Sequence, residues 1–254
     1  MNKTIDSIEI LKILNKIKPE ICQFIDSKMN DFDALEVSTK IDLTPVTIID
    51  IEISKIFKEA FTNAYPFLNF YSEEDPENFN FPCVILDPID GTKELAQGLD
   101  ECAISFGIYF SGDLSSSENF SWIFNPFTHF KAHSSQNFIS SRKKKRSSLY
   151  GLVSNTEFEA DLYTSPTPEV IVMPKGSIAY KLALLSQGVC DFVMTKRPKN
   201  IWDIIAGSHL CHRKGISLFQ NNVEITSLDS PLIDGPLVWC KKEDYPKVKN
   251  LLQK

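Results

Sequence analysis

The hexapeptide Asp87-Pro88-Ile89-Asp90-Gly91-Thr92 comes directly after the apolar run Val84-Ile85-Leu86. A short apolar run is typical of a buried strand, and the proline and glycine that follow it are typical of a turn. Proline fixes its own φ and lacks an amide donor, while glycine lets a backbone approach a ligand closely. The stretch therefore predicts a strand that ends in a turn, with two carboxylates and a hydroxyl facing one space.

Asp87 and Asp90, with no histidine or cysteine between them, are typical of a site for a hard cation such as Mg²⁺. The carbonyl of Ile89 is a plausible extra ligand. The alternative is a solvated turn, so the prediction depends on further carboxylates that can converge on this motif. The chain supplies four near the ends of predicted elements: Asp50, Glu73, Glu74 and Asp203.

Two more of these carboxylates would turn the motif into a site for two cations. Glu73 and Asp203, together with the two aspartates of the hexapeptide, would carry about four negative charges, enough for two divalent ions roughly 4 Å apart. Such a pair can bind a phosphate ester, activate a water and stabilise the leaving oxygen. Taken singly, each of these residues has a simpler interpretation. Asp203 would be a helix N-cap, Glu73 and Glu74 would lie in a solvated turn, and Asp50 would be an exposed helix position.

Composition excludes several classes of protein. The 254 residues can form one large domain or two modest ones, and the formal net charge of −6 argues against nonspecific binding to a nucleic-acid polymer. No stretch approaches the roughly 20 apolar residues that span a bilayer, and the N-terminal segment is too charged for a signal peptide. The six cysteines are scattered without a Cys-x-x-Cys pair, which predicts reduced thiols in a cytoplasmic protein.

Periodicity and turn residues predict helices and strands throughout the chain. A first helix spans about 5–25, and a second begins at Thr44-Pro45, where threonine caps and proline occupies the first turn. Later helices are predicted at 177–187, 203–212 and 244–252. Strands are predicted at 68–71, 83–86, 103–110, 122–124, 149–153, 191–194, 216–219 and 237–240, with further short ones toward Ile139. The basic run 141–148 predicts a boundary between domains 1–145 and 146–254.

Four segments together resemble the Mg²⁺-dependent, lithium-sensitive phosphatases of the inositol monophosphatase superfamily. They are Pro45 to Asp50, Ser72-Glu73-Glu74-Asp75-Pro76, Asp87 to Glu94, and Trp202 to Gly207, so the resemblance covers most of the chain. It implies an α/β fold, the α/β/α/β/α sandwich shared with fructose-1,6-bisphosphatases. It also implies a phosphomonoesterase that binds two or three Mg²⁺ ions and acts on a small phosphorylated substrate. The protein would be a monomer or homodimer.

The resemblance assigns roles to individual residues. The metal ligands would be Glu73, Asp87, the carbonyl of Ile89, Asp90 and Asp203, with Glu74 behind them. Asp50 and Thr92 would orient and deprotonate the attacking water, with Glu73 beside them. Thr92 needs Asp50 for this role, because a hydroxyl acts as a base at neutral pH only if a carboxylate accepts its proton. Substrate would be bound by Gly91, Thr92, Ser177, Lys181 and Asp203.

Within the superfamily, Lys93-Glu94 and Lys199-Asn200-Ile201 resemble the bacterial 3'(2'),5'-bisphosphate nucleotidases. This favours 3'-phosphoadenosine 5'-phosphate as substrate, with an inositol or sugar phosphate as the alternative. Ile205 and the glycine-poor stretch after Thr128 depart from the family pattern, which keeps a third hypothesis open, a noncatalytic binding protein. Counting back from Trp202 places Ser177 where the family has a glycine and Lys181 where nucleotidases have a lysine, with the register open by one residue. Lys181 would hold a second phosphate, or else be a solvated helix lysine.

Overall fold

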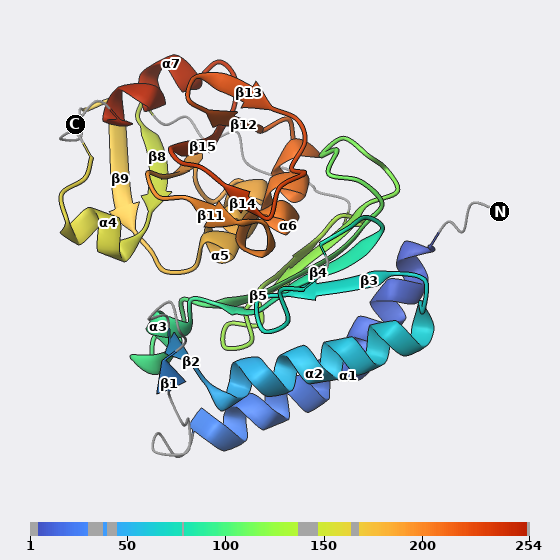
Figure 1. Ribbon diagram of the computed structural model, residues 1–254. Helices are drawn as coiled ribbons and strands as arrows, with labels where there is room; N and C mark the ends of the chain where they lie inside the picture. Colours follow the sequence, from blue (N-terminus) through green and yellow to red (C-terminus); the bar gives the residue numbers. More distant parts are fainter. Residues whose placement is uncertain are drawn as a thin grey trace.

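The protein forms five alternating layers of helices and strands (Figure 1). The structure, a computed structural model, describes residues 5–29, 38–39, 45–77, 79–136, 147–163 and 168–252. In order, the layers are the pair α1 and α2, a first sheet, the pair α5 and α6, a second sheet, and α7 on the outside. The predicted α/β/α/β/α sandwich is confirmed.

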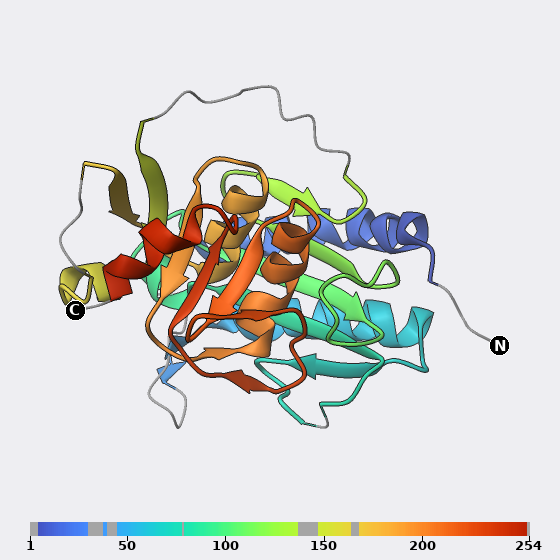
Figure 2. The same ribbon diagram turned by 90° about the horizontal axis from the view of Figure 1, so that it is seen from above.

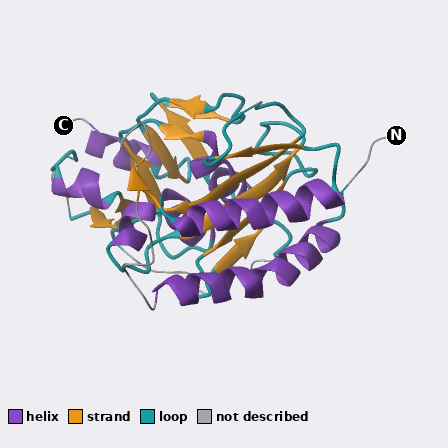
Figure 3. Ribbon diagram, turned by 60° about the horizontal axis from the view of Figure 1, so that its bottom comes forward, coloured by secondary structure: helices purple, strands orange, loops and turns teal. Residues whose placement is uncertain are grey.

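The first layer consists of α1 (Ser7–Met29) and α2 (Ile48–Ala64), which lie side by side across one face of the first sheet (Figure 3). Pro19 lies inside α1, and the helix continues on both sides of it. The predicted start of α2 is wrong. Pro45–Val46 form the short strand β2, paired with β1 (Ser38–Thr39), and the hydroxyl of Thr47 caps the helix by accepting from the amide of Ile49 at 3.2 Å. Thr44 lies outside the described residues.

The first sheet has the order β3-β4-β5-β6-β7 among the described residues. Its parallel pair is β3 and β4, and the other neighbours are antiparallel. Side chains on one face pack against α1 and α2 in a large apolar cluster. The strands are β3 (Asn69–Ser72), β4 (Cys83–Asp90), β5 (Ala103–Tyr109), β6 (Phe120–Phe124) and β7 (Lys131–His133).

The second sheet has the order β13-β12-β15-β10-β8-β9 among the described residues, and α5 and α6 separate it from the first sheet (Figure 1). Figure 2 shows the molecule from above, from the side of the second sheet and α7. Its strands are β8 (Leu149–Val153), β9 (Val170–Pro174), β10 (Phe192–Thr195), β12 (Ser217–Gln220), β13 (Val223–Ile225) and β15 (Leu237–Cys240). The remaining elements are α3 (Thr92–Ala96), α4 (Asn155–Glu159), α5 (Ile178–Ser186), β11 (Lys199–Asn200), α6 (Ile201–His212), β14 (Leu232–Ile233), α7 (Tyr245–Val248) and the 3₁₀ helix Lys249–Leu252.

Two predicted helices differ from the observed ones. The predicted helix 203–212 begins two residues earlier, at Ile201, and the predicted helix 244–252 consists of α7 followed by a 3₁₀ turn. None of the described helices has the length and apolar character needed to cross a membrane.

The two predicted domains share buried contacts. The hydroxyl of Ser105 on β5 donates to the carbonyl of Trp202 at 2.9 Å, and Ser121 on β6 hydrogen-bonds to His209 on α6 at 2.8 Å. One apolar cluster contains Ile85 from the first part of the chain and Trp239 from the second. The proposed boundary at 145/146 and the basic run up to residue 146 lie outside the described residues, so the division into domains stays a prediction.

Candidate active site

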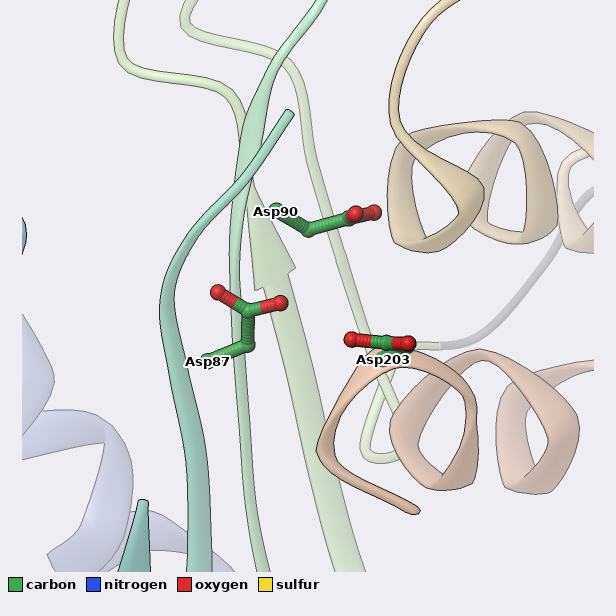
Figure 4. Close-up of side chains that lie close together, drawn as sticks. All are labelled: Asp87, Asp90 and Asp203. Carbon is green, nitrogen blue, oxygen red and sulfur yellow. The ribbon is translucent and has the colours of Figure 1, made fainter. Parts of the chain in front are cut away.

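An irregularity in β4 brings Asp87 and Asp90 to the same side of the strand. Residues three apart on a regular strand face opposite sides. Here Asp87 pairs with Ser105 and Asp90 with Ala103, so the register shifts between the two aspartates. Pro88 lies in this shift, where its missing N–H breaks no ladder bond. The predicted turn after Leu86 is therefore a continuing strand with a bulge, and both carboxylates still face one space, as Figure 4 shows.

Asp203, in the first turn of α6, completes a group of three carboxylates (Figure 4). Asp87, Asp90 and Asp203 each offer an oxygen, and these oxygens lie within 4.8 Å of one another. Asp87 is only 1% exposed, and its Oδ1 has no hydrogen-bond partner among the described residues. A buried carboxylate oxygen is costly to leave unpaired. The group therefore has the charge, the oxygen donors and the open coordinating position that a hard cation requires.

Burial and the repulsion of neighbouring carboxylates make Asp87 and Asp203 hard to ionise. Burial is the main cause that raises the pKa of Asp87 well above its usual range, with Glu73, Asp90 and Asp203 acting in the same direction. Burial also raises the pKa of Asp203 to about 7, although Lys199 opposes the shift. A cation would favour the ionised forms.

Asp203 is not the N-cap of α6. That position belongs to Asn200, whose backbone N–H donates to Asp203 Oδ2 at 3.1 Å. The carboxylate thus lies over the helix N-terminus, where the helix dipole favours a negative charge.

Residues from the second half of the chain donate hydrogen bonds to the carboxylate of Asp90. Its Oδ2 accepts from the hydroxyl of Ser177 at 2.6 Å and from the amide of Ala179 at 2.5 Å. Ser177 caps α5 with φ 53°, a left-handed value that is more typical of glycine. This backbone conformation agrees with the count that places Ser177 at the family's glycine position.

Thr92 and Asp50 form a buried pair next to the three carboxylates. The Thr92 hydroxyl lies 3.1 Å from Asp50 Oδ1 and 2.9 Å from the carbonyl of Ile89. Asp50 is 1% exposed, so it is not the exposed helix residue of the alternative interpretation. Thr47 donates to Asp50 Oδ2 through its amide at 2.9 Å and its hydroxyl at 2.7 Å, and burial nevertheless raises the pKa of Asp50 to about 7.

Gly91 lies between Asp90 and Thr92 with φ +99°. A Cβ at this position would come within 2.9 Å of the carbonyl oxygen of Glu101, so the turn has room only for glycine. The predicted contact of this turn with phosphate stays a prediction.

Glu73 and Glu74 face different spaces. Glu73 follows β3 and lines the same cavity as the three carboxylates, although it is not one of the group within 4.8 Å. Glu74 lines a separate cavity of about 480 Å³ beside α2. The two positions fit the predicted difference in their roles, which itself remains a prediction.

The main cavity has a volume of about 890 Å³ and carries charges of both signs. Its acidic end contains the three aspartates, while Lys93, Lys181, Arg197 and Lys199 also line it. Lys181 is 2% exposed and donates to the carbonyl of Lys175 at 2.7 Å. Burial lowers the pKa of Lys181 to about 8. The alternative of a solvated helix lysine is therefore wrong.

Sequence reasoning missed two residues of this cavity, Arg197 and Glu157. Arg197 belongs to the basic run before Asn200. Because this run is close to Asp203 in the sequence, Arg197 could have been predicted as a residue of the cavity. Glu157 could not have been predicted in this way, because the residues that bind its Oε1, Thr195, Lys196 and Arg197, lie 38 to 40 positions away in the sequence.

Comparison with known proteins places this site in a family. The model of the inositol monophosphatase family matches residues 6–222. The chain belongs to the inositol monophosphatase family. This is a family of metal-dependent phosphatases, and the buried acidic group fits that chemistry.

Two curated relatives and one solved structure are similar to this chain but have low sequence identity to it. The 3'(2'),5'-bisphosphate nucleotidase CysQ of Escherichia coli O6:H1 is 24% identical over 207 residues, covering 74% of this chain and 84% of that protein. CysQ of Buchnera aphidicola is 29% identical over 111 residues, which span 39% of this chain and only 42% of that protein. An IMPase of Thermotoga maritima superposes with a TM-score of 0.75 at 19% identity and covers 96% of both chains, which shows the shared fold.

Cation binding by this inositol monophosphatase family member should be visible in its stability. Because the pKa values of Asp87 and Asp203 are raised in the folded state, both contribute stability at low pH, and the contribution of Asp203 is lost as pH rises through about 7. With chelator, the melting temperature should fall between pH 6 and pH 8. Mg²⁺ should restore it at pH 8 by about 3–8 °C and by less at pH 6. Calorimetry checks this, with Asp203→Asn as the control that should weaken the pH dependence; a Mg²⁺ shift equal at both pH values would contradict it.

Proposed function

We propose that this protein is a Mg²⁺-dependent phosphomonoesterase that hydrolyses a 3'(2'),5'-bisphosphate nucleotide, with 3'-phosphoadenosine 5'-phosphate giving AMP and phosphate. The observation that carries the proposal is a single cavity with a buried carboxylate group at one end and basic side chains around the rest. The names of the Escherichia coli and Buchnera relatives support the nucleotide.

The proposed cation ligands are Asp87, Asp90 and Asp203, with Glu73 and the carbonyl of Ile89 beside them. The unpaired Oδ1 of Asp87 and the oxygens within 4.8 Å support this assignment. Bound Mg²⁺ would supply positive charge to the phosphate and make a nearby water easier to deprotonate.

Thr92 and Asp50 are proposed to handle the proton of the attacking water. Thr92 Oγ1 can accept a hydrogen bond from that water while it donates its own proton to Asp50. Asp50 stays within reach because Thr47 holds its second oxygen. The threonine therefore aims the water, and the carboxylate is the proton acceptor.

The second phosphate is proposed to lie against the basic part of the cavity. Lys181 and Lys199 are candidates to pair with it, and Arg197 can bind it with two parallel hydrogen bonds. Gly91 and Thr92 are proposed to contact the phosphate that reacts, and Ser177 to hold the Asp90 side of the site. A cytoplasmic monomer or homodimer remains the expectation for the whole protein.

Phosphate release from a panel of esters tests the proposal. The panel contains 3'-phosphoadenosine 5'-phosphate, adenosine 3'-phosphate, inositol 1-phosphate and fructose 1,6-bisphosphate, each with Mg²⁺ and with chelator. The bisphosphate nucleotide should have the highest kcat/KM. A preference for inositol or sugar phosphate would overturn the nucleotide assignment, and calorimetric binding without turnover would favour the noncatalytic alternative.

Removing the charge of Lys181 should affect the bisphosphate most. Lys181→Met keeps the apolar stem and should raise KM for the bisphosphate nucleotide by about tenfold or more, with a smaller change for adenosine 3'-phosphate, which has no second phosphate. Steady-state kinetics on both substrates measure this. Lys241→Met, at an exposed lysine, is the matched control. An equal loss on both substrates would contradict the assigned role.

A further inference from the structure

Glu157 is a buried carboxylate that the proposed chemistry does not use. It lies in α4, lines the cavity and is 1% exposed. Its Oε2 accepts from the Tyr163 hydroxyl at 2.6 Å. Its Oε1 accepts from three donors of one segment: Thr195 Oγ1 at 3.0 Å, Lys196 N at 2.8 Å and Arg197 N at 3.1 Å.

The three bonds to Oε1 fix the path of the main chain at the end of β10. A buried carboxylate is tolerated when such donors surround it, and charged acceptors make the stronger hydrogen bonds. Two of the donors are consecutive backbone amides, so their positions set the direction of the chain as it leaves the strand. That chain carries Arg197 and then Pro198 and Lys199 along the cavity. The position of this cavity wall therefore depends on Glu157.

The residues just before Glu157 contact segments from the first half of the chain. Asn155 Nδ2 lies 3.3 Å from Glu94 Oε1 and 3.3 Å from Glu101 Oε2. Thr156 Oγ1 accepts from Lys93 Nζ at 3.3 Å. Lys93 and Glu94 directly follow the turn at Gly91 and Thr92. Residues 155–157 therefore connect this turn to residues 195–197.

We propose that Glu157 is a positioning residue that sets the distance between the acidic end of the cavity and Arg197, and thereby the preference for substrates with a second phosphate. The inference rests on the proposed function and deepens it. Glu157 itself contacts no substrate; it acts through the backbone of residues 195–197. A misplaced Arg197 would lose its geometry toward a second phosphate, while the phosphate at the acidic end would keep its own contacts.

The test compares kcat/KM for the bisphosphate nucleotide and for adenosine 3'-phosphate, which keeps the phosphate that reacts and lacks the second one. Glu157→Asp shortens the side chain, so its carboxylate no longer reaches both amides, and the ratio of the two kcat/KM values should fall about tenfold, mainly through KM of the bisphosphate. Glu157→Gln should restore most of the ratio, because its amide oxygen can accept the three bonds and its NH₂ can donate to Tyr163. Tyr163→Phe is the control, since it leaves Oε1 and its partners in place.

A double-mutant cycle separates positioning from general damage. Arg197→Ala should lower the ratio as Glu157→Asp does, and the double variant should be no worse than Arg197→Ala, because both changes remove one interaction. Equal losses on both substrates, or additive effects, would overturn the inference. Loss of cooperative unfolding in Glu157→Asp would mean that this variant is misfolded, and Thr195→Val then replaces it. Thr195→Val removes one donor to Glu157 and should lower the ratio of the two kcat/KM values severalfold. An unchanged ratio would overturn the inference. A wild-type enzyme without preference for the bisphosphate would instead refute the proposed function.

Discussion

Asp87→Asn is expected to reduce Mg²⁺-dependent kcat/KM by about a thousandfold or more, because losing several kcal/mol of charge stabilisation costs a factor of ten per 1.36 kcal/mol. Asp87 lies at the centre of the acidic group, and its Oδ1 is buried without a partner among the described residues. Asparagine matches its shape and removes only the charge. The measurement is initial-rate phosphate release over a range of Mg²⁺ concentrations.

Stability distinguishes this loss from misfolding. Removing one of three crowded carboxylates relieves their repulsion, so in chelator Asp87→Asn should melt no lower than wild type. Asp100→Asn is the matched control, because it makes the same charge change at an exposed position. Undiminished turnover in Asp87→Asn, or full wild-type turnover in chelator, would refute the metal site.

Thr92→Val should lower kcat by about 10²–10⁴-fold, the usual contribution of general acid–base catalysis, because Asp50 is proposed to take the water's proton through the Thr92 hydroxyl. Valine has the shape of threonine, so the change removes only the hydroxyl that lies 3.1 Å from Asp50 and 2.9 Å from the carbonyl of Ile89. Binding of the cation should persist, since the three aspartates are untouched. Kinetics and calorimetric Mg²⁺ titration of the same variant measure both effects.

Thr92→Ser is the matched control for this prediction. It retains a hydroxyl and should keep most of the activity, while Asp50→Asn, which removes the proton acceptor, should resemble Thr92→Val. Equal rates for the serine and valine variants would show that the hydroxyl does not aim the water.

The layers could be predicted from sequence because they depend on local periodicity. Leu14, Ile17 and Ile21 repeat at helical spacing, and these residues are buried in α1. Boundaries were harder to predict. The second helix begins at Ile48 because Thr47 forms a capping box with Asp50, whereas Thr44-Pro45 had offered an equally good local signal.

The acidic group could be predicted because its residue types and family spacing are distinctive. Its geometry could not, since the bulge in β4 depends on pairing with β5, which no local pattern shows. The burial of Asp50 was also hidden, because its hydrogen-bond partner Thr92 lies 42 positions away. Glu157 escaped for the same reason: its donors at Thr195 and Arg197 come from a segment that only the second sheet brings close.

The hydrogen bonds from Ser177 and Ala179 to Asp90 have a consequence for the order in which the molecule forms. The proposed cation site needs β4, α5 and α6 together, and these elements are far apart along the chain. Contacts between distant segments form late in folding, since closing long loops costs entropy. A cation therefore meets its complete set of ligands only after the folding barrier is crossed. It should prolong the lifetime of the native state by slowing unfolding, and leave the rate of folding nearly unchanged.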